Sequence, residues 1–160
     1  MSKTVWIFPG QGAQKVGMAK DFYENSTLAR QLFDEADAAL DFNLKDTCFE
    51  ENEQIHLTEY TQPCLVTACL AMAAELRKRG FRPDMTAGLS LGEYAAIAAA
   101  GGMSPPDAIR LVRKRGLLMQ NTIPAGEGAM CAVLGMETAV IETVLSGVDG
   151  VTIANYNCPG

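Results

Sequence analysis

Met85-Thr-Ala-Gly-Leu-Ser-Leu-Gly-Glu-Tyr94 is the stretch around which the rest of the chain can be arranged, because it contains a G-x-S-x-G pattern centred on Ser90. Short, mostly uncharged residues precede Gly88, and helix-forming residues follow Ser90, so the serine lies where a strand would turn sharply into a helix. Flanking glycines leave room for the close backbone approach that such a turn requires. The turn would carry the hydroxyl to a helix N-terminus, where free N–H groups favour a developing oxyanion.

The pattern around Ser90 admits two interpretations. A glycine-rich loop can close a strand–helix turn without doing any chemistry, and three fixed residues also recur by chance. A nucleophile elbow requires the strand–turn–helix context that is present here. That context favours a nucleophile, and we predict this role for Ser90.

A second glycine-rich segment, Gly10-Gln-Gly-Ala-Gln-Lys-Val-Gly17, follows a predicted buried strand at Val5 to Phe8. A strand followed by Gly-x-Gly suggests a dinucleotide site, but Lys15 occupies the place of the third glycine in that fingerprint. The better interpretation is a tight loop at the carboxyl end of a strand, where open α/β sheets bind ligands. Its backbone N–H groups are candidates to line an oxyanion hole.

Capping residues and apolar periodicity predict three long helices besides the one after Ser90. They span residues 27–40 with Ser26 as N-cap, residues 61–79 with Pro63 in the first turn, and residues 104–121. Residues 41–60 between the first two are polar and acidic, which predicts a loop with short helical turns. The last helix carries four cations, Arg110, Arg113, Lys114 and Arg115. An arginine there is either a surface charge or a group that projects into the site.

The pattern changes after the loop at residues 124–128, which we expect to be a subdomain boundary. A strand at 129–134, a helix at 137–146 and a strand at 151–156 are predicted beyond it. A strand–helix–strand unit this small needs further strands to bury its faces. We therefore expect a chain that is truncated within its fold.

Composition excludes several classes of function. The 160 residues carry a net charge of −6, which disfavours nucleic acid as a partner, and no apolar run is long enough to span a membrane. One histidine and five cysteines without a C-x-x-C pair do not suggest a metal site. We expect reduced, mostly buried thiols in a cytoplasmic protein. The five cysteines are Cys48, Cys64, Cys69, Cys131 and Cys158.

Six motifs in order resemble the N-terminal half of the malonyl-CoA:acyl carrier protein transacylases of fatty-acid synthesis, and the resemblance covers the whole chain. They are Phe8-Pro-Gly-Gln-Gly12, Thr61-Gln-Pro63, Gly88-Leu-Ser-Leu-Gly-Glu93, Arg113-Lys-Arg-Gly116 with Met119-Gln120, Gly126-Glu-Gly-Ala-Met130 and Asn155-Tyr-Asn-Cys-Pro-Gly160.

The resemblance implies an α/β fold with an α/β-hydrolase-like core at residues 1–125 and the beginning of a small ferredoxin-like subdomain at 126–160. It implies that Ser90 is the nucleophile and that the backbone N–H groups of Gln11 and Leu91 form the oxyanion hole. It assigns Arg115 to the malonyl carboxylate, which suits a guanidinium because that group can bind a carboxylate through two N–H donors. The implied substrates are malonyl-CoA and acyl carrier protein, with no cofactor and no metal.

The sequence departs from the family pattern at two points. Leu89 stands where the family often has histidine, which removes a polar neighbour of the serine. The family's catalytic histidine would lie in a half of the chain that is absent, and His56 matches no catalytic position. Because a serine without its base loses roughly 10⁴–10⁶ in rate, we expect these residues alone to be nearly inactive. A second polypeptide carrying the remainder is the alternative to a truncated piece.

Two other functions stay open at this point. One is a serine hydrolase or thioesterase on a similar core, and the other is a non-catalytic fragment that keeps only the shape of the fold. The basic groups at 77–79 and 110–115 either cap helix ends or form a rim that steers an acidic carrier protein.

Overall fold

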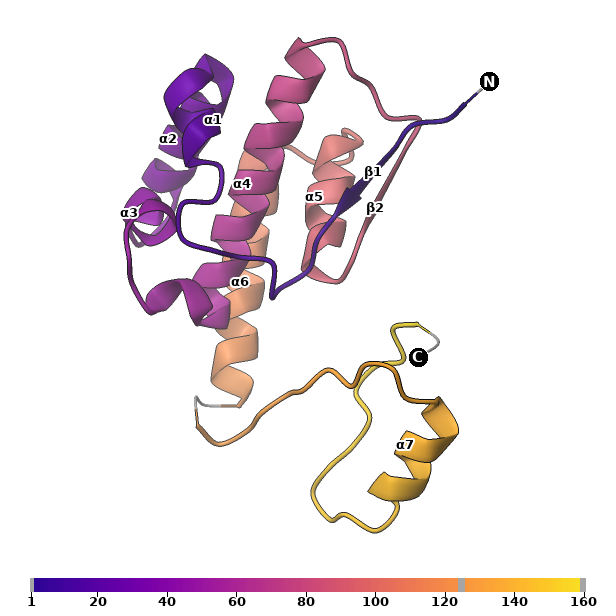
Figure 1. Cartoon of the computed structure of the whole chain (residues 1–160). Coiled ribbons are helices and arrows are strands. Elements are labelled where there is room, and N and C mark those ends of the chain that lie inside the picture. The colour runs from indigo at the N-terminus through magenta and orange to yellow at the C-terminus, as the bar shows by residue number, and fades with distance from the viewer. Residues whose placement is uncertain (1, 124–125, 159–160) are drawn as a thin grey trace. The chain divides into compact units, whose positions relative to one another are not determined.

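A short parallel sheet underlies the turn at Ser90. The computed structural model describes residues 2–123 and 126–158, and its chain divides into two units, Met1–Ala125 and Gly126–Gly160 (Figure 1). In the first unit, β1 (Val5–Phe8) pairs in parallel with β2 (Met85–Gly88), and Phe8 lies opposite Gly88. Both strands were predicted from the sequence and are confirmed, but β1 is not the buried strand that was expected, because only its Phe8 is buried.

Helices make up most of the first unit, which is a mixed α/β structure. In chain order they are α1 (Lys20–Asn25), α2 (Thr27–Ala39), α3 (Leu44–Phe49), the 3-10 turn η1 (Gln54–His56), α4 (Thr58–Lys78), α5 (Leu91–Ala99) and α6 (Pro105–Thr122). The predicted helices at 27–40 and 104–121 are confirmed as α2 and α6, and the helix expected after Ser90 is α5. The helical turns expected within 41–60 are α3 and η1.

Helix α4 is the centre of the hydrophobic core. It lies between α2 and α5 (Figure 1) and also contacts α1, α3 and α6. Its buried residues point in several directions, from Cys64 and Val66 to Ala68 and Ala71, as expected for a helix covered on most sides. Phe33 and Ile109 bring α2 and α6 into the same core.

The start of α4 corrects one expectation. The helix begins at Thr58, three residues before the predicted Thr61, so Pro63 lies inside it and not in its first turn. A proline has no N–H to donate to the carbonyl four residues earlier, which here is that of Glu59. The guanidinium of Arg113 supplies the missing donor, since its Nη1 lies 2.9 Å from the Glu59 carbonyl oxygen. A tertiary contact therefore permits a helical turn that the local sequence disfavours.

The caps of the long helices follow the sequence. The Ser26 hydroxyl accepts a hydrogen bond from the Ala29 N–H and donates to Glu75 at 2.6 Å, which ties α2 to α4. Helix α4 ends at Lys78, and Gly80 follows its C-cap with a φ of +90°, which suits a residue without a side chain. Arg77 donates to the carbonyl of Ala99, and Lys78 and Arg79 both pair with Glu75, so all three cations of the 77–79 group make intramolecular contacts.

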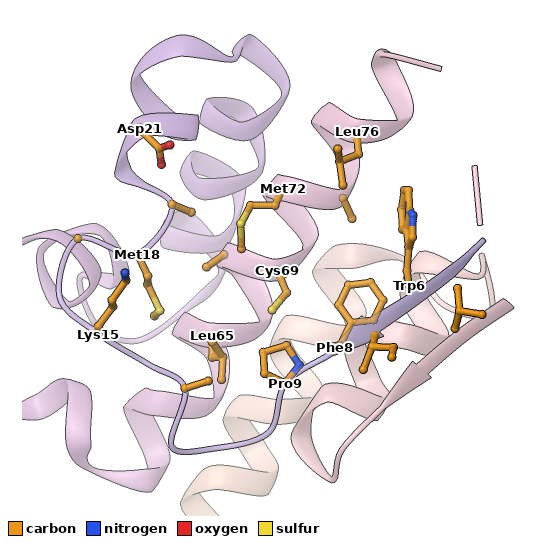
Figure 2. A pocket seen from close by; sticks show the side chains of 17 residues that line it. Trp6, Phe8, Pro9, Lys15, Met18, Asp21, Leu65, Cys69, Met72 and Leu76 are labelled. Atoms are coloured by element: carbon orange, nitrogen blue, oxygen red, sulfur yellow. The ribbon is translucent and has the colours of Figure 1, made fainter. Parts of the chain in front are cut away.

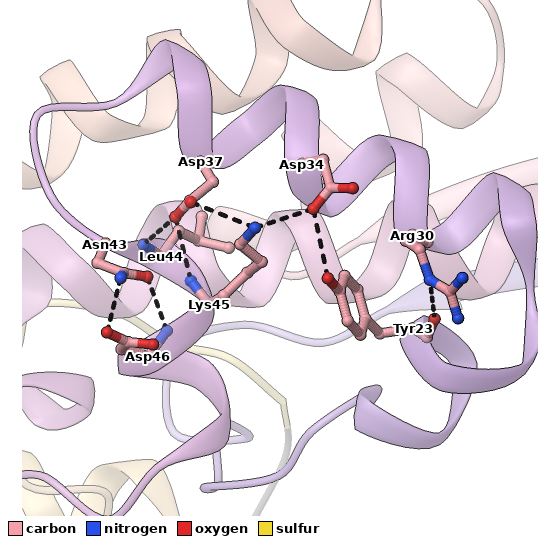
Figure 3. A network of polar contacts seen from close by, with 8 residues as sticks. All are labelled: Tyr23, Arg30, Asp34, Asp37, Asn43, Leu44, Lys45 and Asp46. Atoms are coloured by element: carbon pink, nitrogen blue, oxygen red, sulfur yellow. Dashed lines mark hydrogen bonds and ion pairs between the residues drawn. The ribbon is translucent and has the colours of Figure 1, made fainter.

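A polar network joins α2 to α3 (Figure 3). Asp37 accepts hydrogen bonds from the backbone N–H groups of Leu44 and Lys45, and the Lys45 ammonium lies 2.9 Å from Asp34. Asn43 caps α3 by accepting from the Asp46 N–H. The acidic residues of α2 therefore anchor the following turn, and the pKa of Lys45 is raised, chiefly by its hydrogen bond to Asp34.

The second unit differs from its prediction. Helix α7 (Thr138–Leu145) confirms the helix expected at 137–146, but residues 129–134 and 151–156 form no strand. Strand backbone groups need a ladder of hydrogen bonds, and within the described residues no neighbouring strand pairs with either segment. The side chains of 129–134 are exposed accordingly. Of the loop expected at 124–128, Pro124 and Ala125 lie outside the described residues.

Three of the five cysteines are buried, namely Cys48, Cys64 and Cys69, and all five are free thiols. Burial raises the pKa of Cys69 to about 11, so this thiol stays protonated at neutral pH. Among the described residues, no helix is both long and apolar enough to cross a membrane.

Candidate active site

The backbone at Ser90 has the geometry of a strained turn. Its φ of +49° and ψ of −102° are unusual for a residue with a side chain, and α5 begins at the next residue. A Cβ at Gly88 would overlap the backbone of Gly92 and Glu93, and a Cβ at Gly92 would overlap that of Phe8. Both glycines of the G-x-S-x-G pattern are therefore required by the close approach of β1, β2 and α5.

The loop after β1 lies directly against this turn. The Leu89 N–H donates to the Phe8 carbonyl at 3.1 Å, which continues the β1–β2 ladder by one residue. A Cβ at Gly10 would lie 2.9 Å from the Leu89 carbonyl oxygen, so only glycine allows this approach. The two glycine-rich segments of the sequence thus leave the same edge of the sheet together.

The two predicted oxyanion donors lie on these neighbouring segments. Among the hydrogen bonds of residues 2–123, the backbone N–H groups of Gln11 and Leu91 have no acceptor. The Gln11 side chain is held away from the backbone by its hydrogen bond to the Thr58 hydroxyl at 2.9 Å. Leu91 is the first residue of α5, where helix N–H groups are free and the helix dipole favours negative charge.

Arg115 reaches the serine from α6. Its Nη2 lies 3.1 Å from the Ser90 Oγ, and its Nη1 lies 2.7 Å from Oε1 of the buried Gln62. The guanidinium carbon is 5.6 Å from the centroid of the Tyr94 ring, a cation–π distance. No carboxylate within 4.0 Å pairs with Arg115 among the described residues, so its positive charge is available to an anionic ligand.

A close crossing of two helices brings Arg115 to this place. A Cβ at Gly116 would lie 2.8 Å from the Glu59 Cα and 3.0 Å from the Thr58 carbonyl oxygen, so α6 touches the backbone of α4 here. Any larger residue would push the helices apart. Since Arg115 precedes this glycine, the crossing sets its distance from both Gln62 and Ser90.

Arg113 is placed quite differently. Its guanidinium is 8% exposed and binds Asp41 through two N–H donors, at 2.8 and 2.9 Å, and Glu59 at 3.1 Å. The rings of Phe42 and Tyr60 lie beside it. The hydrogen bonds from Arg113 lower the pKa of Asp41. Burial disfavours the charge on Arg113, but Asp41 and Glu59 outweigh it, so the pKa of Arg113 is raised.

Sequence reasoning missed two residues around Arg115, Gln62 and Tyr94. Gln62 was noted only within the Thr61-Gln-Pro63 motif at a helix start and was given no role, although an amide on the apolar face that continues to Leu65 signals a specific polar contact. Leu89, which departs from the family pattern, is 60% exposed beside Gly10. His56 is exposed in η1 and makes no hydrogen bond to Ser90. In the part of the chain that the structure describes, no cluster of potential metal ligands exists.

A cavity of about 600 Å³ lies away from the serine, between β1 and α4 (Figure 2). Phe8, Leu65, Cys69 and Met72 give it an apolar wall. Neither Ser90 nor Arg115 lines it, so it is not the place where the candidate chemistry would occur.

Residues 5–160 match the acyl transferase domain. The chain belongs to the acyl transferase domain family. A malonyl CoA-acyl carrier protein transacylase from Bacillus subtilis (strain 168) is 47% identical over 165 residues, an alignment that covers 100% of this chain and 52% of that protein. The transacylase of the same name from Clostridium perfringens has a solved structure with 37% identity and a TM-score of 0.86, covering 99% of this chain and 52% of that one.

A second similar structure shows a type II PKS acyl-carrier protein in complex with its malonyl-transacylase. It is 36% identical with a TM-score of 0.89 and covers 99% of this chain and 53% of its counterpart. The chain therefore spans about half the length of these relatives of the family.

Proposed function

We propose that this chain contributes the nucleophile and the substrate-carboxylate site of a malonyl-CoA:acyl carrier protein transacylase in fatty-acid biosynthesis. The observation that carries the proposal is the position of Arg115. Its guanidinium touches the Ser90 hydroxyl at 3.1 Å and has only neutral partners among the described residues. A free cation beside a strained serine suits an acyl group that ends in a carboxylate.

The proposed reaction proceeds in two steps. Ser90 Oγ attacks the thioester carbonyl of malonyl-CoA, the C–S bond breaks, and the thiol of coenzyme A leaves with a proton. The thiol of the acyl carrier protein then attacks the acyl-serine ester, and Ser90 regains its hydroxyl proton. In both steps the N–H groups of Gln11 and Leu91 would donate to the oxyanion, each worth about 3 kcal/mol.

The serine also needs a general base, and we propose that a second polypeptide or a further segment supplies it. The chain's one histidine, His56, does not contact Ser90. Two features favour additional polypeptide in the first unit. Within the described residues, β1 and β2 form a sheet of only two strands, and Ile7 of β1 is 77% exposed. The apolar cavity beside β1 offers a surface for packing (Figure 2).

Three finer points belong to the same proposal. The first unit would be an α/β-hydrolase-like core, supported by the strand–Ser90–helix turn, and residues 126–160 would begin a ferredoxin-like subdomain, supported so far only by α7. A cytoplasmic location is supported by the free thiols of all five cysteines.

The test is the mass of the intact chain after brief exposure to malonyl-CoA, with and without a polypeptide that corresponds to the other half of the relatives. We expect little adduct on the chain alone and a malonyl adduct on Ser90 in the mixture. Ser90→Ala is the control, because it removes only the nucleophile. If the mixture transfers malonyl groups to the thiol of a carrier protein and Ser90 still carries no adduct, the assignment of the nucleophile is wrong.

The same experiment separates the other two hypotheses. A hydrolase or thioesterase would release free malonate without passing it to a carrier-protein thiol, and the relatives' names do not favour this reading. A non-catalytic fragment would give no adduct with any partner. Transfer to the thiol that depends on Ser90 would exclude both.

A further inference from the structure

We infer that Gln62 is a positioning residue that holds the Arg115 guanidinium beside Ser90 without neutralising its charge. The inference rests on the proposed function, because Arg115 is there the group that binds the substrate carboxylate. It adds a role for a residue in α4 that touches neither Ser90 nor, in the proposed reaction, any reacting atom.

The contact between Gln62 and Arg115 has only one possible polarity. A guanidinium donates hydrogen bonds and accepts none, so only the amide oxygen of Gln62 can face it. The oxygen does so, at 2.7 Å from Arg115 Nη1. The Gln62 side chain is fully buried, with 0% exposure, and a buried amide cannot turn to water instead.

The other end of the amide is held as well. Gln62 Nε2 lies 3.2 Å from the sulfur of Met119, which is four residues after Arg115 and therefore on the same face of α6. Turning the amide over would place its NH2 group against the guanidinium and its oxygen against the sulfur. Both contacts would be unfavourable, so Met119 fixes the orientation in which the oxygen faces Arg115.

The important property of Gln62 is that its side chain carries no charge. Gln62 and Ser90 each take one of the five N–H donors of Arg115, which leaves three for a carboxylate. A glutamate at this position would fill the same space but would pair with the cation. The amide therefore orients the guanidinium and leaves its charge for the ligand.

The inference is tested by NMR of the arginine side chains of the whole chain, combined with titration of malonate as the probe. When both terminal nitrogens are held, rotation about the Nε–Cζ bond is slow and their signals are separate. We expect separate Nη signals for Arg115, identified by their loss in Arg115→Ala. In Gln62→Met they should merge, and malonate binding should weaken about tenfold, the effect of one lost charge-assisted contact.

Two further variants and a control sharpen the test. Gln62→Glu should keep the signals separate but weaken malonate binding by more than tenfold, because it supplies a competing carboxylate. Met119→Leu, at a half-exposed position, should partly merge the signals and weaken binding roughly twofold to threefold. Gln31→Met changes the same residue type on the exposed face of α2 and should alter neither measurement. Thermal unfolding of each variant shows that it is folded.

The outcomes separate this inference from the proposed function. The positioning role is wrong if Gln62→Met folds and keeps the separate signals and the malonate affinity of the unaltered chain. If Gln62→Met does not fold, the same result for Met119→Leu leads to the same conclusion. The same conclusion follows if the unaltered chain shows merged signals. If the unaltered chain shows separate signals but no malonate binding, the carboxylate site fails and the positioning role stands.

Discussion

Arg113 and Arg115 lie two residues apart on α6, yet their surroundings are opposite. Arg113 is buried beside two aromatic rings and binds Asp41 and Glu59 as well as the Glu59 carbonyl. Arg115 contacts an amide and a hydroxyl, and no carboxylate pairs with it in residues 2–123. Arg113 is therefore paired with two carboxylates, whereas Arg115 is paired with none in these residues.

The comparison shows how a structure separates a stabilising charge from a functional one. A buried guanidinium that is paired contributes to the fold, because removing it leaves its partners unsatisfied. A guanidinium with neutral partners contributes little to the fold but keeps its attraction for an anion. Substitution of Arg113 should therefore lower stability, whereas substitution of Arg115 should lower malonyl binding and transfer.

Arg115→Ala should lower the rate of malonyl transfer to Ser90, measured with the complementary half present, by roughly 10²-fold or more, because a bidentate carboxylate contact is lost. Its unfolding free energy should fall by about 1–2 kcal/mol, less than for Arg113→Met, because only the buried Gln62 oxygen loses its donor. Acylation by a neutral thioester such as acetyl-CoA is the control and should fall far less. Equal losses for both thioesters would remove the distinction between the two arginines.

Arg113→Met should lower the free energy of unfolding by about 3 kcal/mol, because Glu59 loses a donor for both its side chain and its carbonyl oxygen. Urea denaturation measures the change. Arg110→Met is the matched control, since Arg110 pairs with Asp107 on the exposed face of the same helix and should contribute less than about 1 kcal/mol. Similar values for the two variants would mean that the Arg113 network is not what stabilises this crossing.

Gly116→Ala acts on both arginines at once. Alanine favours a helix by about 1 kcal/mol over glycine, but here its Cβ would lie 2.8 Å from the Glu59 Cα. We expect a net loss of about 1–3 kcal/mol in unfolding free energy, together with weaker malonate binding. Lys114→Ala, at the exposed neighbouring position, should change neither quantity. A more stable Gly116→Ala variant would show that the helices can separate without cost.

Of the two arginines, only the paired Arg113 should contribute to the pH dependence of stability. Because Arg113 holds the pKa of Asp41 below its ordinary value of 3.8, the ionised carboxylate stabilises the folded chain at neutral pH. That contribution is lost as the pH falls through the lowered pKa. Since the Asp41 side chain is 64% exposed, the effect should be under about 1 kcal/mol.

The free energy of unfolding is measured for Asp41→Asn and for the unaltered chain between about pH 6 and about pH 3. The difference between the two curves of free energy against pH gives the contribution of the Asp41 charge. The curves should converge at the acid end. The unfolding free energy of Arg115→Ala, plotted against pH, should run parallel to that of the unaltered chain over the whole range. A difference between Asp41→Asn and the unaltered chain that does not shrink with acid would assign the stabilisation to something other than the charge of Asp41.

The local parts of the site could be predicted because they depend on short-range rules. A serine between Gly88 and Gly92, after a short apolar strand and before an alanine-rich helix, has few other ways to fold. Ser26, Ser104 and Gly80 mark helix ends through contacts within a few residues. The segments 129–134 and 151–156 could not be predicted in this way, because a strand needs a partner that its own sequence does not provide.

Short-range rules suffice to specify the turn at Ser90, the loop at Gly10 to Gly17 and the order of the long helices, since each rests on backbone conformation and apolar spacing over a few residues. Helix spacing and charge do not distinguish the two arginines, and before the structure only the family resemblance pointed to Arg115. Both Arg113 and Arg115 fit the same helix with the same charge. The crossing of α6 over α4 at Gly116 gives one of them two carboxylates and the other an amide, and such a difference arises from contacts between residues more than 50 positions apart.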